Sequence, residues 1–297
     1  KVTLTKVGGA VVEVIAAAPA VDKTDVKTAS NYRADVIDTL PNARTMEGVA
    51  LLTPGVTAGV GGRVQIRGAQ TSGNLYLLDG QNIADNAYNN RGVAVIDDSI
   101  EETQVITGAM SAEYGDVDGG VINSITKSGS NEFSGSLRWE LSNAAWNATA
   151  PTQNRNAINN VLNEEKTLFL SGPILKDKLF FFAGLDANKV QTNEALNPPN
   201  LNGLKNGKRT TDTYQFLTKV NWYLNQDQQL TFSVNLNNQK DDYPKAYPGT
   251  LGDASLGALT KFTTQNFVVN YDWTISPSLF LSAKLGTTEA GIVPHFR

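Results

Sequence analysis

The sequence contains no cysteine and only one histidine, His295, which lies two residues from its end. Disulfide bridges, thiolate metal sites and cysteine nucleophiles are therefore excluded. A single histidine also leaves no material for the usual zinc sites or for a catalytic triad. The 29 Asp and Glu residues leave one enzymatic class open, a hydrolase that uses carboxylates alone. No nucleophile–base set is visible, and we expect no enzymatic activity, no metal and no cofactor.

The sequence also lacks a continuous apolar run of about 18 residues, which excludes a transmembrane helix. This absence does not exclude a membrane protein, because the strands of a barrel alternate apolar and polar residues. The mean hydropathy of -0.25 agrees with a soluble protein and with a barrel. The formal net charge is -4 and no run of Lys or Arg stands out, so nucleic acid is not an expected partner.

The second half of the chain has a sequence period of two. In the segment 229–237, Leu230, Phe232, Val234 and Leu236 alternate with polar residues. Successive side chains of a strand point to opposite faces, so this pattern predicts strands with one apolar face. We expect strands at 132–141, 166–172, 178–189, 211–224, 229–238, 264–275 and 278–287.

Alternation alone fits two architectures equally well, a soluble antiparallel sandwich and a transmembrane barrel. The links between the expected strands favour the barrel, because short and long links alternate strictly. The short links are Pro173–Asp177, Asn225–Gln228 and Ser276–Pro277, and the long links are Ser142–Glu165, Val190–Thr210 and Gln239–Thr263. Short periplasmic turns and long extracellular loops give an outer-membrane barrel this rhythm. Trp139, Trp222 and Trp273, near strand ends, match its interfacial girdles.

Seven strands do not close a bacterial barrel, whose strand number is normally even. An open strand edge does not sit in hydrocarbon, because its backbone groups would lack hydrogen-bond partners there. We therefore interpret the chain as an N-terminal part of a larger polypeptide.

The first half of the chain reads as a compact α+β domain with short elements. Residues 43–52 place Met46 and Val49 on one helical face, and Pro54 ends that helix. Residues 108–114 are expected to form one or two helical turns. Strands are expected at 64–66, 75–78, 102–107 and 121–126, with a turn at Asp79-Gly80.

Short motifs in the first half occur in a fixed order, namely Leu52–Val56, Val64–Gly68, Leu75–Gly80, Ala112–Gly115 and Gly119–Lys127. In this order and spacing, the region resembles the plug domain of TonB-dependent outer-membrane receptors. The resemblance implies that the plug motifs are carried by Pro54, Gly55, Arg67, Gly68, Asp79, Gly80, Glu113, Tyr114 and Gly115. Further along, Ser171–Phe182 resembles the first periplasmic turn of the Oar-like subgroup.

The resemblance implies three parts. Residues 1–20 are the end of an N-terminal domain and a TonB-box-like segment, residues 21–130 are the plug domain, and residues 131–297 are the N-terminal part of the barrel. The residues of the box-like segment are Val12, Glu13, Val14 and Ile15. In the family, a TonB box pairs with TonB of the inner-membrane energising complex as an added strand, through main-chain hydrogen bonds. The alternative interpretation is a plain strand of the preceding domain.

One position departs from the family pattern. The family usually has Arg-Gly-Pro before its Tyr-Gly motif, whereas this chain has Thr107-Gly108-Ala109. An Arg that helps to hold the plug against the barrel wall is therefore expected to be missing there, and Arg67 is a candidate for that role. The alternative for Arg67 is a solvated surface charge.

The long link 239–263 contains Tyr243 and Tyr247, which are candidate extracellular contacts with a substrate. Ordinary loop packing is the alternative for both tyrosines. Asp116 and Asp118 are interpreted as turn acids, because the full oxygen-ligand pattern of a calcium loop is absent.

The resemblance implies TonB-dependent active transport of a substrate across the outer membrane, with the plug gating the barrel lumen. A complete barrel of this kind has about 22 strands, of which about seven are present. The chain would lie in the outer membrane, in contact with its lipid, with the plug accessible from the periplasm. The Oar-like subgroup favours larger substrates such as peptides or proteins. The alternative function is a soluble β-rich binding or adhesin module, which detergent dependence would distinguish.

Overall fold

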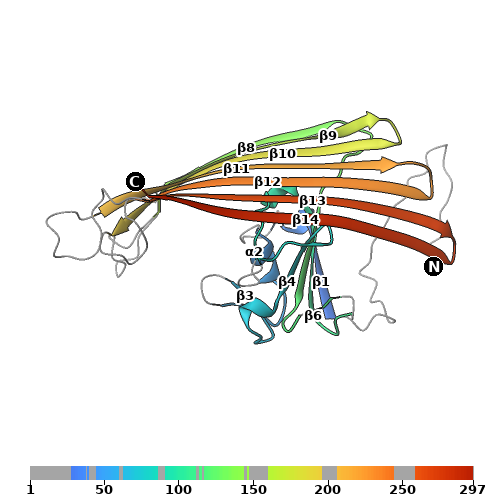
Figure 1. Ribbon diagram of the computed structural model, residues 1–297, viewed down its shortest axis with the longest axis horizontal. Coiled ribbons are helices and arrows are strands. Elements are labelled where there is room, and N and C mark those ends of the chain that lie inside the picture. The colour runs from blue at the N-terminus through green and yellow to red at the C-terminus, as the bar shows by residue number, and fades with distance from the viewer. Residues whose placement is uncertain are drawn as a thin grey trace.

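The structure is a computed structural model with two parts, a small α+β domain and a long curved antiparallel sheet (Figure 1). Among the residues that it describes, no helix is long and apolar enough to cross a membrane. The structure describes residues 28–37, 39, 45–59, 63–85, 91–111, 114, 115, 117–143, 146, 160–195, 206–243 and 258–296.

A five-stranded sheet forms the centre of the first domain, with the strand order β1-β6-β7-β4-β5. Its strands are β1 (Thr28–Arg33), β4 (Leu75–Leu78), β5 (Gln81–Asn82), β6 (Ile100–Gly108) and β7 (Val121–Thr126). β4 lies parallel to β7, and the other neighbours are antiparallel. A separate hairpin pairs β2 (Val56–Ala58) with β3 (Val64–Ile66).

Two short helices, α1 (Ala34–Ile37) and α2 (Met46–Ala50), pack against this sheet. α2 begins after Thr45, whose Oγ1 accepts a hydrogen bond from the backbone N–H of Gly48 at 3.0 Å. Its apolar side chains join the core of the domain, which is fully buried at Met46, Val64, Ile66, Ile83, Val105 and Ile122. We call this domain the plug.

The second part is a seven-stranded sheet with the order β14-β13-β12-β11-β10-β9-β8, so each strand pairs with its neighbour in sequence. The strands are β8 (Ser134–Ser142), β9 (Asn160–Leu175), β10 (Leu179–Ala195), β11 (Asn206–Tyr223), β12 (Gln228–Tyr243), β13 (Ala258–Ser276) and β14 (Leu279–Phe296). All six pairings are antiparallel. The sheet is not closed, since β8 and β14 form its two edges. We call this sheet the wall.

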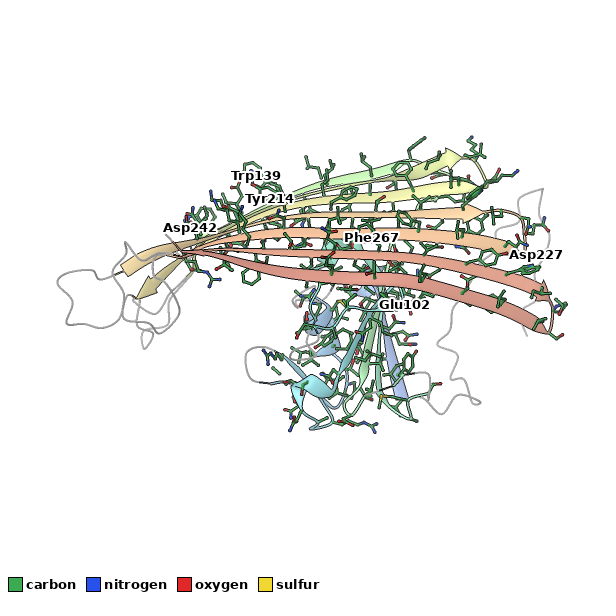
Figure 2. The ribbon with its side chains drawn as sticks, in the orientation of Figure 1. Glu102, Trp139, Tyr214, Asp227, Asp242 and Phe267 are labelled. Atoms are coloured by element: carbon green, nitrogen blue, oxygen red, sulfur yellow. The ribbon has the colours of Figure 1, made fainter. Side chains whose placement is uncertain are left out.

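The wall is apolar on its outside and polar on its inside. On β12, Thr231, Ser233 and Asn235 are 7%, 7% and 2% exposed, whereas Phe232 between them is 40% exposed. The plug lies on the side of the polar face (Figure 1). Trp139 and Tyr214 project from the opposite side, where they are 67% and 62% exposed (Figure 2). A soluble sheet buries its apolar face, so this arrangement is that of a barrel wall facing lipid.

The wall confirms the expected strands and their up-and-down order, but most of its strands are longer than expected. β12 ends at Tyr243 rather than at residue 238, and β13 begins at Ala258 rather than at residue 264. Three short turns, at 176–178, 224–227 and 277–278, lie near the three short links that the sequence predicts. The links at the other end of the wall are longer, in agreement with the predicted rhythm.

The expected helical turns at residues 108–114 are wrong where the structure describes them. Gly108 is the last residue of β6 and pairs with Thr28 of β1. Ala109 has a φ of 51°, which lies in the left-handed region and does not continue a right-handed helix. No helix is present at residues 108–111, 114 or 115.

Candidate functional site: the interface between plug and wall

The turn that follows β4 brings the plug against the wall. Asp79 and Gly80 have φ values of 49° and 76°, as required in the tight turn that joins β4 to β5. Gly80 also lies close to the wall, because the flexible end of the Lys284 side chain on β14 would have to move aside for an added Cβ. The turn therefore places the Asp79 carboxylate at the polar inner face of the wall.

Asp79 forms a buried ion pair with Lys219 of β11. The Lys219 Nζ donates to Asp79 Oδ1 at 2.9 Å and to the backbone oxygen of Thr126 at 2.9 Å. Thr126 also donates to Asp79, from its backbone N–H at 3.1 Å and from Oγ1 at 2.7 Å. The two charged side chains are only 7% and 6% exposed. These additional hydrogen bonds offset the desolvation penalty that a buried ion pair carries.

A second contact is made by the segment before β6. Asn235 of β12 donates from Nδ2 to the backbone oxygen of Ala94 at 2.8 Å. Two residues further on, Ile96 packs into an apolar cluster with three inward-facing residues of the wall, Phe169, Phe182 and Leu217. The Phe169 and Phe182 rings are stacked, with centroids 5.5 Å apart. This cluster is an apolar patch on a largely polar inner face, and it receives an apolar side chain of the plug.

Space for the cluster comes from Gly184 of β10. A Cβ at Gly184 would lie 2.7 Å from Cε1 of Phe169 and 3.4 Å from Cδ1 of Ile96. A larger residue would therefore displace the Phe169 ring, on which Ile96 packs.

A third contact is electrostatic and involves the first strand of the wall. Arg138 of β8 forms an ion pair with Asp98 of the plug, and its Nη2 donates to Glu165 of β9 at 2.9 Å. The plug carboxylate thus shares one guanidinium with a carboxylate of the wall. A bidentate guanidinium fits such an arrangement better than a lysine ammonium.

Asp97, beside this contact, carries a perturbed carboxyl group. Burial raises the pKa of Asp97 to about 6, and the nearby positive charge of Arg91 opposes this effect. Its Oδ1 has no hydrogen-bond partner among the described residues. The protonated form is therefore favoured at this position more than in solution.

The plug motifs predicted from the sequence occupy several different places. Asp79 and Gly80 lie at the wall, as described above. Pro54, Gly55, Arg67 and Gly68 are exposed and lie around the β2–β3 hairpin, where the Arg67 N–H donates to the Gly55 oxygen at 2.8 Å. Tyr114 packs beside the buried side chains of Leu77, Ile106 and Val121, and Gly115 follows it.

Arg67 does not contact the wall in the described part of the chain. Its guanidinium lies against Gly108 of the plug itself, where an added Cβ would be 2.6 Å from Nη1. The role of Arg67 in holding the plug stays a prediction. Glu113, Tyr247 and the box-like residues Val12, Glu13, Val14 and Ile15 lie outside the described residues, and Tyr243 ends β12.

Sequence reasoning missed the wall residues that hold the plug, Lys219, Arg138, Asn235 and Phe169. The period-two pattern places Lys219 and Asn235 on the polar face of their strands, which is a signal for the lumen but not for a partner. Phe169 faces inward against the pattern of its strand, where Leu168 and Leu170 are exposed. An aromatic residue on the polar face was the one available sign of an apolar contact with the plug.

Comparison with known protein families supports both parts. Residues 22–121 match the family described as TonB-dependent receptor plug domain, and residues 125–200 and 188–295 match the family described as outer membrane beta barrel domain. The TonB-dependent transporter Oar of Myxococcus xanthus is 29% identical, over 76% of this chain and 25% of that protein. The chain thus spans about a quarter of the length of this curated relative.

Solved structures show the same fold. The outer membrane transporter YddB from Escherichia coli has a TM-score of 0.70 at 15% identity, covering 87% of this chain and 38% of that one. The siderophore receptor PirA from Pseudomonas aeruginosa has a TM-score of 0.62 at 20% identity, covering 89% and 41%. The polar inner face, the plug beside it and the two family matches agree on one assignment. The chain belongs to the TonB-dependent receptors of the outer membrane, of which it contains a plug domain and antiparallel strands of the β-barrel.

Proposed function

We propose that this chain serves TonB-dependent active transport of a substrate across the outer membrane, with the plug gating the barrel lumen. The observation that carries the proposal is the contact between the plug and the inner face of the wall. Asp79 and Lys219 are buried there, and the plug also rests on the Phe169 and Phe182 rings through Ile96. A plug seated on the lumenal face closes that part of the passage, and transport requires these contacts to open.

The energy for opening would come from TonB. The box-like residues Val12 to Ile15 precede the plug in sequence, and TonB would pair with them as an added strand. Tension on this segment would act on the plug, and the interface with the wall would separate. The relatives named above are transporters and receptors, and a catalytic function has no place in this cycle.

The substrate class follows from the relatives only in part. PirA is named as a siderophore receptor, whereas the resemblance to the Oar-like subgroup favours peptides or proteins. We favour the larger substrates, because the Oar transporter matches this chain with higher sequence identity. Tyr243 and Tyr247, at the extracellular end of β12 and in the link after it, are candidate contacts. A soluble adhesin is disfavoured by the exposed apolar face of the wall, which needs lipid or detergent.

The proposal is tested by the accessibility of the plug in living cells, because the chain has no cysteine of its own. Ile96 is 3% exposed at the interface, so Ile96→Cys provides a buried reporter. We expect a maleimide reagent to label this cysteine several-fold faster in cells with an active TonB complex than in cells without TonB. Labelling is measured as the mass shift of the protein extracted from the outer membrane.

Val36→Cys is the matched control, because Val36 is 47% exposed on α1 and does not depend on the interface. Its labelling should be the same with and without TonB. Equal labelling of Ile96→Cys in both strains would contradict TonB-driven opening of the plug.

A further inference from the structure

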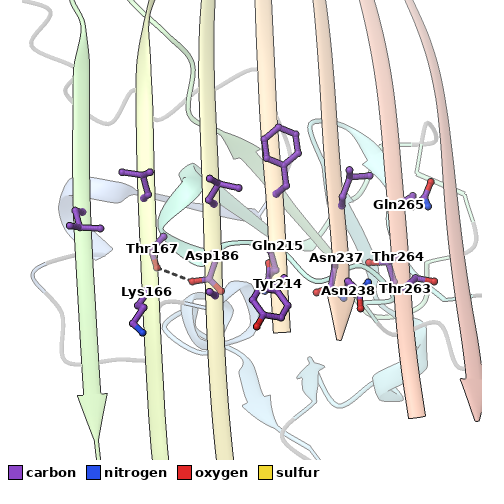
Figure 3. Close-up of a pocket in the computed structure, with 16 residues that line it drawn as sticks. Lys166, Thr167, Asp186, Tyr214, Gln215, Asn237, Asn238, Thr263, Thr264 and Gln265 are labelled. Carbon is purple, nitrogen blue, oxygen red and sulfur yellow. Dashed lines mark hydrogen bonds between the residues drawn. The ribbon is translucent and has the colours of Figure 1, made fainter. Parts of the chain in front are cut away.

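The outer face of the wall, opposite the plug, has an apolar depression with a volume of about 570 Å³ (Figure 3). Its apolar floor is formed by Leu168, Leu185, Phe216 and Leu236, which lie on four consecutive strands. Registers place these residues side by side, because Leu168 pairs with Leu185, Leu185 with Phe216, and Phe216 with Leu236. In the membrane, this surface faces lipid rather than the lumen.

The next row of outward residues toward the long links has an interfacial character. Trp139, Lys166, Tyr214, Asn238 and Thr263 are in register across the wall. Aromatic and amphipathic side chains of this kind mark the boundary between hydrocarbon and headgroups. Trp222, eight residues from Tyr214 on the same face of β11, is part of the opposite boundary. This spacing is about 27 Å along the strand, which a strand tilt of about 35–45° reduces to roughly 20 Å across the membrane, somewhat less than the usual apolar band of about 25 Å.

One row further out, the outward residues are charged. Glu164, Lys189, Asp212, Lys240 and Lys261 are in register on β9 to β13. This row therefore lies at the level of the lipid headgroups. Because the longer links of an outer-membrane barrel are extracellular, the headgroups are those of the outer leaflet.

Within this row, Lys240 and Lys261 stand directly opposite each other on β12 and β13, and both are exposed. Like charges at directly opposed positions of an antiparallel pair destabilise it. The carboxylates nearby have other lysine partners: Glu164 lies 2.8 Å from Lys166, and Asp212, which also faces Lys240 across β11 and β12, lies 3.9 Å from Lys189. Asp242, further along the same face, also has an interaction partner. An anion between the two lysines would remove their repulsion.

We propose that the wall binds a lipid with a phosphate headgroup from the outer leaflet. The phosphate lies between Lys240 and Lys261, and an acyl chain occupies the depression floored by Leu185, Phe216 and Leu236. Lysine binds phosphate as a point charge, and its aliphatic stem lies along apolar surface while the ammonium reaches the headgroup level. The assignment uses the lipid-facing side of the wall and is independent of what the lumen transports.

The test compares lipid retained by the protein extracted from its outer membrane in mild detergent. Native mass spectrometry counts the phosphate-bearing lipids on the wild type, on K240Q/K261Q and on the control K176Q/K178Q. The control removes two exposed lysines of the turn at residues 176–178, at the opposite end of the wall. We expect the wild type and the control to retain the same lipid. K240Q/K261Q should bind it about tenfold or more weakly, since each lysine near an anionic lipid surface contributes measurably.

A second variant, Phe216→Ala, tests the contribution of the acyl chain to lipid binding separately from that of the headgroup. It should weaken lipid retention while both lysines remain, because it removes part of the apolar floor. Unchanged retention in K240Q/K261Q would overturn the proposed phosphate site, and an equal loss in K176Q/K178Q would do the same by showing a general charge effect. Unchanged retention in Phe216→Ala would overturn the placement of the acyl chain.

Discussion

At the residue scale, the interface depends on charges that face partners far away in sequence. Lys219 and Asp79 are separated by 140 positions, yet their side chains meet at 2.9 Å and are nearly excluded from solvent. Such a pair is stable only with both partners present, because a single buried charge keeps its desolvation penalty. Sequence motifs identified Asp79 and Gly80 as important, but nothing local to them indicates a lysine on a distant strand as their partner.

Removing only the lysine tests this dependence. Lys219→Met should destabilise the seated plug by roughly 3 to 5 kcal/mol, because Asp79 is left buried without its cation. Hydrogen exchange of the plug amides, above all that of Thr126, should accelerate accordingly. The double variant Asp79→Asn/Lys219→Met should be less affected than Lys219→Met alone, since it removes both charges. A double variant as unstable as the sum of the two single variants would show that the pair is not coupled.

Asp97 gives the plug a dependence on pH. Its pKa is raised from the ordinary 3.8 to about 6, so the folded plug holds this proton more tightly than the unfolded chain does. The protonated Asp97 carboxyl therefore contributes to the free energy of unfolding. This contribution is fully present below pH 3.8 and is lost as the pH rises through about 6. We expect the unfolding temperature of the plug to fall over this window, as followed by calorimetry. Asp97→Asn should flatten that dependence, and an unchanged slope in this variant would assign it to other groups.

At the scale of elements, the sequence predicts the strands well where one face meets lipid. The strand expected at 229–238 is β12, and the strand expected at 264–275 is β13. The ends were missed because outside the hydrocarbon both faces of a strand are polar, as in Lys240, Asp241 and Asp242. A period of two disappears there although the backbone pairing continues.

The two faces of the wall should respond differently to the same charge. Phe232 points outward one row inside the boundary that Trp222 marks, so Phe232→Lys should destabilise the folded barrel by roughly 1 to 2 kcal/mol. Gln215→Lys introduces the same charge on the inner face and should be tolerated. The folded fraction in lipid vesicles, measured by denaturant titration of the protein from its outer membrane, compares the two. Equal destabilisation by both substitutions would be incompatible with an outward Phe232.

At the scale of the whole molecule, the relation of plug to wall was the least predictable feature. The family resemblance implies that the plug lies inside the barrel, and alternation shows which residues of each strand face inward. The alternation does not give the register between strands, and this register decides which inward residues of neighbouring strands come together. Lys219, Ser233 and Val268 form one row only because three strands pair as they do. The interface with the plug depends on those rows, so it became visible only in the folded structure.

The strand order of the plug also sets a sequence of mechanical events. β1 lies at one edge of the plug sheet and is paired only with β6, whereas β4, which carries the turn to Asp79, lies toward the other edge. Under the proposed function, force enters through the residues before Thr28 and reaches β1 first. β1 can therefore peel from the sheet while the anchor at Asp79 still holds. The load then passes strand by strand toward the wall, so that a gap opens beside the plug before its last attachment is strained.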